Sequence, residues 1–475
     1  MSATIHPLVR PGRQEASACV FDADLIRRLD RNGPRYTSYP TADRFHPGYT
    51  ADTHAGWAGR RNRGGLARPL SLYVHVPFCG TICFYCGCNK VVTRDRRKAE
   101  QYLQYLDREI ALHGALMRGG PKVDQLHFGG GTPTYLTADQ IGMAMQALRS
   151  NFEFSETFEG SIEIDPRTVD AHTIAALAAH GFNRMSLGVQ DFDPEVQRAI
   201  NRIQSEEQTA AVMQAGRAHG FGSINVDLIY GLPKQTIETV SNTLDRVIAL
   251  GADRIAFYNY AHLPALFKPQ RRILEADLPS PDAKLQTLGE AIRRLTAAGY
   301  VHIGMDHFAK PGDELAVAQR QGRLHRNFQG YSTHAECDLV GLGASAIGML
   351  GPTFYQNVRT LPEYYERLDA NRLPIMRGFE MTPDDLVRRS VIQALMCHFE
   401  LCKEAIEFSW LLDFDTYFAS ELSDLAVMEA EGLVELDRHW ITVTPRGRLL
   451  IRSICMVFDR YLRADQERRR YSKVI

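Results

Sequence analysis

Hydrophobic residues between about residue 69 and residue 309 follow two alternating patterns along the chain. Runs in which every second residue is apolar alternate with longer segments in which apolar residues recur every three or four positions, as in strands and amphipathic helices. One helical face carries Ile237, Val240, Leu244, Val247 and Ile248. The predicted strands are Ser71–Val76, Gln125–Phe128, Ser161–Asp165, Met185–Gln190, Ile224–Tyr230 and Ile255–Tyr260, with a further strand expected at His302–Asp306.

Several predicted helices end in a glycine followed by an apolar residue, at Gly181-Phe182, Gly220-Phe221 and Gly299-Tyr300. Glycine readily takes the left-handed conformation that closes a helix. A helix end followed each time by a strand indicates repeated βα units. Six or more such units predict an α/β protein whose parallel sheet curls into a full or partial TIM-like barrel, and we expect a partial (β/α)6 barrel.

The second residue of each alternation is small or polar in every predicted strand. Side chains of successive strand residues point to opposite faces, so one face of the sheet is apolar and packs on helices. The other face is polar and suits a ligand at the carboxyl ends of the strands better than it suits a dry core. Its members are Tyr73, His75, Gln125, His127, Glu163, Asp165, Ser186, Gly188, Gln190, Asn225 and Asp227.

Three regions follow from these patterns: an N-terminal arm or lid (1–65), a catalytic barrel with its extension (66–375) and a C-terminal domain (376–475). Residues 1 to about 22 show no periodicity and are expected to form a loose arm. The C-terminal domain is expected to be mostly helical, with a short hairpin of Leu433–Leu436 and Trp440–Val443 that resembles a winged helix. It lacks a concentrated basic recognition helix, so we interpret it as a cap over the barrel.

The segment from Asn32 to Thr41 is rich in turn residues and aromatics. It fits a surface linker and an ordered lid over the site equally well. In a lid, Arg35 could pair with a carboxylate through both arms of its guanidinium.

The composition argues against nucleic-acid binding, membrane insertion and secretion. The 475 residues are 44% hydrophobic and carry a net charge of -1, so no global basic field indicates nucleic acid or an anionic membrane surface. No apolar run is long enough for a membrane span, and no signal-peptide pattern is present. Nine cysteines, of which four lie in one loop, fit the reducing cytoplasm.

The densest chemical motif is the loop from Cys79 to Cys88, directly after the first predicted strand. Cys79, Cys83 and Cys86 have the spacing C-x3-C-x2-C. Three thiols at this spacing can hold one corner of a cubane iron-sulfur cluster and leave one iron open for a substrate. Zinc is the main alternative, but no second Cys or His pair with a matching spacing is evident. Disulfides between thiols this close are disfavoured by geometry.

Other motifs surround this loop. The run Gly129–Thr134 follows the second predicted strand, and it lacks the lysine of a P-loop. It allows close approach of the backbone to a ligand. Gly304–Ala309 and His325–Tyr331 concentrate histidine, arginine and aromatic residues, a combination that suits a flat anionic ligand. Gly341–Ile347 is interpreted as close-packed backbone beside the site.

The cysteine loop, with Tyr85 just before its third cysteine, resembles the signature of the radical S-adenosylmethionine (SAM) enzymes. In that family the open iron is chelated by the amino and carboxylate groups of SAM. One electron from the reduced 4Fe-4S cluster then splits SAM into methionine and a 5′-deoxyadenosyl radical, which takes hydrogen from the substrate. In the same family a glycine-rich motif at the position of Gly129–Thr134 meets the amino group of SAM.

Almost the whole chain is similar to the oxygen-independent coproporphyrinogen III oxidases (coproporphyrinogen dehydrogenases). The matching segments are Gly33–Pro40, Cys86–Lys90, Gly129–Thr134, Gly188–Asp191, Asp227–Pro233 and His325–Tyr331. The resemblance implies an oxidoreductase of haem (porphyrin) biosynthesis. It would convert two propionate side chains of coproporphyrinogen III to vinyl groups, giving protoporphyrinogen IX, two CO2, two methionines and two 5′-deoxyadenosines.

The same resemblance implies the site residues and partners. The cluster would be ligated by Cys79, Cys83 and Cys86. The SAM bound to the cluster would contact Tyr73, Gly130 and Glu163, with Ile347 nearby. A second SAM site is matched by Tyr85, Gly131, Thr132, Gln190, Arg202, Asp227 and Ala261. The role of Cys88 stays open. We expect a cytoplasmic monomer with a low-potential electron donor such as a flavodoxin or ferredoxin, and no nucleic acid or membrane partner.

Two alternatives remain. A related haem-binding group keeps the radical SAM core without this activity, but its members lack the Gly33–Pro40 arm and the cysteine that corresponds to Cys88. A zinc-stabilised scaffold is the more distant alternative.

Overall fold

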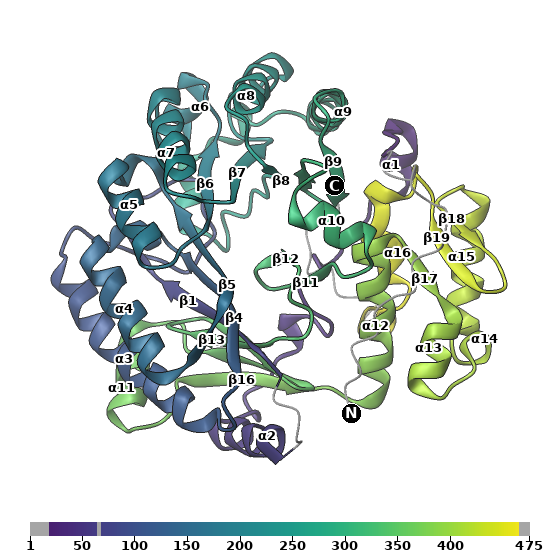
Figure 1. Cartoon of the computed structure of the whole chain (residues 1–475). Coiled ribbons are helices and arrows are strands. Elements are labelled where there is room, and N and C mark those ends of the chain that lie inside the picture. Colours follow the sequence, from purple (N-terminus) through teal and green to yellow (C-terminus); the bar gives the residue numbers. More distant parts are fainter. Residues whose placement is uncertain (1–18, 64–67, 465–475) are drawn as a thin grey trace.

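A curved sheet of twelve strands forms the centre of the computed structural model, which describes residues 19–63 and 68–464 (Figure 1). Six neighbouring strands are parallel and form the partial barrel that the sequence predicts. They are β1 (Leu70–Val76), β4 (Lys122–Gly130), β5 (Glu153–Ile164), β6 (Arg184–Gln190), β7 (Ser223–Tyr230) and β8 (Arg254–Asn259). Each predicted strand is present, and the α/β barrel class is confirmed.

Further strands extend the sheet at both edges. On one side β13 (Asp338–Leu342) pairs parallel with β1 and is followed by the antiparallel strands β14 (Ile347–Leu350), β15 (Thr353–Asn357) and β16 (Ile375–Glu380). On the other side β10 (His307–Ala309) and β9 (Val301–Gly304) follow β8. The strand expected at His302–Asp306 is therefore present as β9, but it is an antiparallel edge strand because it forms a hairpin with β10.

Helices cover the outer face of the barrel strands (Figure 1). They are α3 (Arg97–Leu116), α4 (Ala138–Asn151), α5 (Ala171–Ala179), α6 (Pro194–Ala199), α7 (Glu206–Ala218), α8 (Ile237–Ala249) and α9 (Pro281–Ala297). In α8 the predicted stripe buries Val240, Leu244 and Val247, whereas Ile237 at the first turn stays exposed. Thr236 begins this helix with a capping box, which satisfies two backbone donors of the first turn.

Glycines end the helices as the sequence predicts. Gly181, Gly220 and Gly299 have φ angles of +102°, +82° and +84°. The next residue donates its backbone N–H back into the helix in each case; the Phe182 N–H, for example, donates to the Leu177 carbonyl at 3.1 Å. The chain can therefore turn at once into the following strand.

The two faces of the sheet differ as the alternation predicts. Leu72, Val74 and Leu126 are fully buried in the main core between sheet and helices. On the inner face, the side chain of Gln125 accepts a hydrogen bond from Ser71 at 2.9 Å and donates to Glu159 at 3.1 Å. The barrel interior thus holds a connected polar network instead of a dry core.

The N-terminal arm is ordered over its described part, which consists of α1 (Ala23–Leu29), a 3-10 turn (Ala42–Arg44) and α2 (Ala51–Arg63). Tyr36 and Tyr39 are almost completely buried, and the Tyr36 hydroxyl donates to Asp459 at 3.0 Å. This packing favours the ordered lid over the surface linker. Most of the loose arm expected at residues 1 to about 22 lies outside the described residues.

The C-terminal elements form a lobe beside the barrel, and α12 contacts β9, β11 and α10 (Figure 1). They are α12 (Pro383–His398), β17 (Glu400–Cys402), α13 (Lys403–Trp410), α14 (Phe414–Tyr417), α15 (Ala419–Ala430), β18 (Val434–Leu436), β19 (Trp440–Val443), a 3-10 turn (Arg448–Leu450), α16 (Ile451–Met456) and α17 (Arg460–Ala464). The predicted hairpin is β18 and β19; β17 joins it as a third strand that the sequence analysis missed. Residues 376–380, assigned above to this lobe, belong to β16 and are hydrogen-bonded into the catalytic sheet.

The remaining elements connect the barrel to its extension. They are β2 (Phe78–Cys79), β3 (Val91–Val92), α10 (Glu314–Arg320), β11 (His325–Asn327), β12 (Gly330–Ser332), α11 (Leu361–Asp369) and 3-10 turns at Pro133–Tyr135, Pro166–Thr168, Lys268–Arg272 and Glu275–Asp277. Within the described ranges, every helix is too short or too polar to cross a lipid bilayer.

Glu109 of α3 ties the barrel to its extension. Its carboxylate is 0% exposed and accepts hydrogen bonds from the Gly343 backbone N–H at 2.7 Å, the Asn357 amide at 2.6 Å and the Tyr364 hydroxyl at 2.5 Å. Burial raises the pKa of Glu109 from 4.5 to about 7, although these hydrogen bonds oppose the shift.

The Glu109→Gln variant should remove a pH dependence of stability. Because the folded pKa is raised, the contribution of Glu109 to the free energy of unfolding is fully present below about pH 4.5 and is lost as the pH rises through about 7. That loss is on the order of 3 kcal/mol in the unsubstituted protein. Urea unfolding at pH values between these limits measures this fall in the free energy of unfolding. The control is Glu100→Gln, at an exposed position of the same helix. An undiminished fall in the stability of E109Q would contradict the assignment.

Candidate active site

The cysteine loop is anchored at both ends by backbone pairing. It follows β1, and β2 at its start pairs in parallel with β3 after its end. The Val91 N–H donates to the Pro77 carbonyl at 2.7 Å, and the Thr93 N–H donates to the Cys79 carbonyl at 3.0 Å. The thiols are thereby held at the carboxyl end of the first barrel strand.

A cavity of about 630 Å³ opens over this loop at the carboxyl ends of the barrel strands. It brings together Cys79, Cys83, Cys86, Tyr85, Gly130, Gly131, Thr132, Glu163, Gln190, Arg202 and Asp227 of the residues predicted above. Tyr73, Ala261 and Ile347 do not line it. These three form a layer around the cavity instead.

Each of the three outer residues has a link to the cavity. Tyr73 stacks on His127 with ring centroids 5.8 Å apart, and His127 Nε2 lies 3.4 Å from Glu163. Ile347 packs in the same apolar cluster as Tyr73. The Ala261 carbonyl accepts a hydrogen bond from Gln270, which also donates to the Tyr85 carbonyl at 2.8 Å.

The glycine run and the cysteine loop touch through their backbones. The Gly131 N–H donates to the Val76 carbonyl at 2.8 Å, and the Thr132 N–H donates to the Phe78 carbonyl at 2.9 Å. A Cβ atom on Gly131 would lie 2.8 Å from the Pro77 backbone. Only glycine leaves room for this approach, so the run forms one wall of the cavity.

Two acidic side chains, Glu163 and Asp227, also line the cavity. Glu163 accepts a hydrogen bond from the Gly130 N–H at 3.1 Å, and its side chain is partly exposed to the cavity. Asp227 accepts hydrogen bonds from Ser186 and Asn225, both at 2.9 Å. Burial raises the pKa of Asp227 to about 6, although the Ser186 hydroxyl opposes the shift. Both groups can accept from hydroxyl or ammonium donors of a ligand.

Two guanidinium groups lie beside the thiol of Cys83. Arg202 Nη1 is 3.7 Å and Arg167 Nη2 is 4.0 Å from its sulfur. Asp165 pairs with both arginines, and their charges and hydrogen bonds lower its pKa despite burial. The alternation predicts Asp165 on the polar face, but neither Asp165 nor Arg167 was among the predicted site residues. Their position directly after a barrel strand was the available signal.

The thiols of the cysteine loop differ in pKa. Burial raises the pKa of Cys79 to about 11, although a hydrogen bond from Thr132 opposes the shift. A hydrogen bond from Cys88 lowers the pKa of Cys86 to about 5, against the effect of burial. Cys88 therefore contacts a predicted cluster ligand, both through its thiol and through its N–H, 3.4 Å from the Cys86 sulfur.

The spacing of the thiols distinguishes a cluster from a single ion. Tetrahedral zinc with bonds of about 2.3 Å would bring sulfur ligands to roughly 3.8 Å from one another. Among the described residues, no three ligand atoms of this loop lie within 4.8 Å of one another. Three free thiols around one cavity, with cationic donors beside them, fit the larger cubane cluster.

Comparison with known proteins agrees with this geometry. The family model "Radical SAM superfamily" matches residues 73–247, and "HemN C-terminal domain" matches residues 381–450. The chain is 52% identical to the oxygen-independent coproporphyrinogen III oxidase of Pseudomonas aeruginosa, over 96% of this chain and 99% of that protein. It is 51% identical to the Escherichia coli K12 protein of the same name, over 96% and 98%. The chain belongs to the oxygen-independent coproporphyrinogen III oxidase family.

A solved structure supports the membership. The coproporphyrinogen III oxidase (HemN) of Escherichia coli, described as a radical SAM enzyme, superposes with a TM-score of 0.89 at 50% identity, covering 94% of this chain and all of that one. As a radical SAM protein, this member of the oxidase family uses a 4Fe-4S cluster and SAM. Sequence similarity alone does not assign the individual ligand contacts, which remain predictions.

The Gly131→Ala variant tests the glycine wall. Its Cβ would meet the Pro77 backbone, and relieving such overpacking costs about 1–3 kcal/mol. We expect SAM to bind the reconstituted variant roughly ten- to a hundredfold more weakly, as measured by equilibrium dialysis alongside iron content. Gly80→Ala is the matched control, because its Cβ would have no neighbour within 4 Å. Equal SAM affinity in the two variants would show that the close backbone approach at Gly131 does not contribute to SAM binding.

Proposed function

We propose that this chain converts two propionate side chains of coproporphyrinogen III to vinyl groups, giving protoporphyrinogen IX in haem biosynthesis. The observation that carries the proposal beyond family membership is a pair of buried guanidinium groups with unsatisfied nitrogens. Arg326 and Arg452 are 5% and 7% exposed; Arg326 Nε and Nη1 and Arg452 Nη1 have no hydrogen-bond partner among the described residues. A buried cation without a counter-ion is costly, and an anionic ligand would compensate it.

The two arginines line separate cavities: Arg326 lies with Ser71 and His325, and Arg452 lies with Tyr230 and Ala261. Arg452, Arg35 and Asp306 line a second cavity of about 300 Å³ together with Ala261. Burial lowers the pKa of Arg452 to about 10, and Asp306 opposes the shift only in part. Arg35 lies 3.8 Å from Asp306 and keeps part of its surface exposed. Four substrate carboxylates would find cationic partners here.

Tyr258 lies between the two regions. It lines the cavity over the cysteine loop, and its hydroxyl is 3.5 Å from His307, next to Asp306. Burial raises its pKa, so the hydroxyl stays protonated and can donate a hydrogen bond. A flat ligand that spans the barrel top from Asp227 toward Arg452 would pass this side chain.

We propose that Cys79, Cys83 and Cys86 hold the 4Fe-4S cluster and that Tyr73, Gly130, Glu163 and Ile347 surround the SAM bound to it. Bound there, the cluster and SAM would supply the radical chemistry that removes hydrogen from the propionate β-carbon. Arg167 and Arg202 would stabilise the thiolate charge of the loop. The buried arm around Tyr36 and Tyr39 would keep water away from the site.

A second SAM molecule is part of the proposal. Tyr85, Gly131, Thr132, Gln190, Arg202, Asp227 and Ala261 would contact it. Gln270 supports this arrangement, because it links the backbone of Tyr85 to that of Ala261. Asp227 offers a carboxylate to ribose hydroxyls or an ammonium group.

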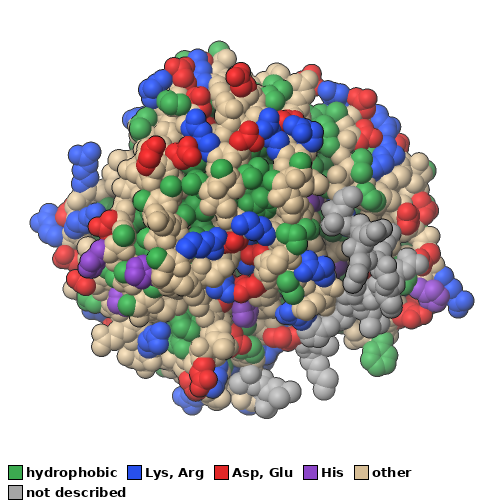
Figure 2. All heavy atoms as spheres, turned by 45° about the horizontal axis from the view of Figure 1, so that its top comes forward, with side chains coloured by type: hydrophobic (Ala, Val, Ile, Leu, Met, Phe, Trp, Pro, Cys, Tyr) green, Lys and Arg blue, Asp and Glu red, His purple; other side chains and the backbone are tan. Residues whose placement is uncertain are grey.

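We further propose a cytoplasmic monomer that receives electrons from a flavodoxin or ferredoxin. Gly80 and Thr81 in the cysteine loop are exposed, which gives a donor close approach to the cluster. The nine cysteines are all free, as expected in a reducing compartment. Lys and Arg are interspersed with Asp and Glu on the face shown in Figure 2, so this face offers no basic patch for nucleic acid.

An anaerobic assay with dithionite, SAM and coproporphyrinogen III tests the reaction. We expect vinyl product together with about one 5′-deoxyadenosine for each vinyl group formed. Cleavage of SAM without porphyrin product would move the substrate elsewhere. Haem binding without either product would favour a haem carrier.

The Arg452→Gln variant tests the substrate contact. We expect KM for coproporphyrinogen III to rise roughly ten- to a hundredfold, because a hydrogen bond to a charged group contributes about 1.5–3 kcal/mol. Iron content and SAM affinity should stay unchanged. Stability should not fall, since the buried charge has incomplete compensation. Arg438→Gln, at an exposed position of the same lobe, is the control; an unchanged KM in R452Q would exclude this contact.

A further inference from the structure

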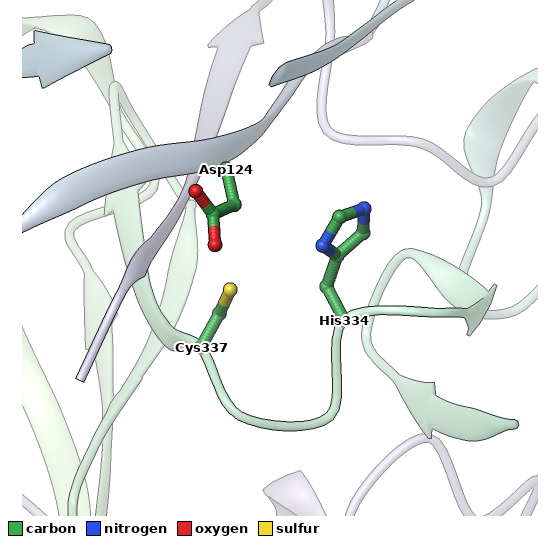
Figure 3. A group of neighbouring side chains, drawn as sticks. All are labelled: Asp124, His334 and Cys337. Atoms are coloured by element: carbon green, nitrogen blue, oxygen red, sulfur yellow. The ribbon is translucent and has the colours of Figure 1, made fainter. Parts of the chain in front are cut away.

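A second group of metal-ligating side chains lies far from the cysteine loop. Asp124, His334 and Cys337 each place one ligand atom within 4.8 Å of the others (Figure 3). Asp124 is at the start of β4, whereas Gly130 of the SAM wall is at its end. Six residues of strand separate the two positions by on the order of 20 Å. The group is therefore independent of the cluster site.

The strand is deformed at Asp124. In the pairing with β1, Leu70 is opposite Val123 and Ser71 is opposite Gln125, so Asp124 has no opposite residue. The pairing with β5 also passes from Val123 to Gln125. Such a bulge re-aims the side chain of the extra residue. Figure 3 shows the Asp124 carboxylate directed toward the Cys337 sulfur.

The histidine is oriented by a neighbour. His334 Nε2 lies 3.5 Å from the carboxylate of Glu159, which also accepts a hydrogen bond from Gln125 at 3.1 Å. In Figure 3 the ring nitrogen next to the Cβ attachment is turned toward Asp124 and Cys337, and the other nitrogen is turned away. A carboxylate on the distal nitrogen leaves the near one free as a metal ligand, the arrangement common in metal sites.

The carboxylate has no other use within the described part of the chain. No hydrogen-bond donor or cation there contacts Asp124. Cys337 is 5% exposed, so its thiol is shielded from water. A thiolate, an imidazole and a carboxylate together are the ligand types of zinc, and they differ from the all-oxygen sets of magnesium and calcium.

We propose that Asp124, His334 and Cys337 bind one zinc ion, with a water molecule in the fourth position. The ion would join β4 to the segment between β12 and β13. That segment follows the β11–β12 hairpin, which carries Arg326. The site would thus fix the hairpin against the base of the barrel without taking part in the radical chemistry.

Metal analysis of the reconstituted holoenzyme tests the site. After exposure to zinc and gel filtration, we expect about one zinc for about four irons per chain. Asp124→Asn and Cys337→Ala should reduce the zinc content at least tenfold and leave the iron content unchanged. Cys402→Ala, at a buried cysteine outside the group, should keep the zinc. A zinc content that is low in the unsubstituted protein, or equal in all variants, would overturn the proposal.

Cobalt substitution gives a readout that does not depend on the folding of a variant. The unsubstituted protein with Co²⁺ should show a sulfur-to-cobalt charge-transfer band and the intense visible bands of tetrahedral coordination. Alkylation of Cys337 should slow when zinc is bound. Absence of the charge-transfer band together with unchanged alkylation would also overturn the proposal.

Discussion

The close contact between the glycine run after β4 and the backbone before the cysteine loop is the constraint on which the site depends. Two backbone hydrogen bonds join Gly131 and Thr132 to the carbonyls of Val76 and Phe78. The contact is possible because position 131 has no Cβ. It places the backbone of the glycine run beside the three thiols. A molecule bound to the open iron of the cluster would therefore lie against this backbone. Parallel strands bring such loops to one edge of the sheet, which explains why the chemistry gathers there.

The buried arginines differ in how completely their charges are paired. Next to the thiols, Arg167 and Arg202 share the single carboxylate of Asp165, so part of their positive charge is left to stabilise thiolate charge. Away from the thiols, Arg326 and Arg452 have buried nitrogens without a hydrogen-bond partner among the described residues. A folded protein keeps such buried cations only at a cost in stability. A ligand with several carboxylates would pair with these arginines and offset this loss of stability.

The extension and the C-terminal lobe cover the open sides of the partial barrel. The parallel strands end at β8, and the sheet remains open beyond them. At the other edge of the sheet, β13 pairs parallel with β1 and β14 to β16 continue in antiparallel pairing, while α12 packs on β9 beside the opening. Tyr36 and Glu109 show how buried polar contacts connect distant segments. A partial barrel with separate closing elements leaves more room for a large ligand than a closed one would.

The local features could be predicted from the residues alone: the strand and helix periods, the glycines that end helices, the polar inner face and the thiol spacing. Each depends on residues close together along the chain, so composition and alternation suffice to read it. Family resemblance added the expected site residues, most of which line one cavity. Only the tertiary structure decided the rest. Asp165 beside two arginines, Gln270 between Tyr85 and Ala261, the antiparallel β9, and β16 within the catalytic sheet all depend on long-range pairing. The meeting of Asp124 with His334 and Cys337 is of the same kind, because a bulge and a distant loop create a proximity that no local pattern encodes.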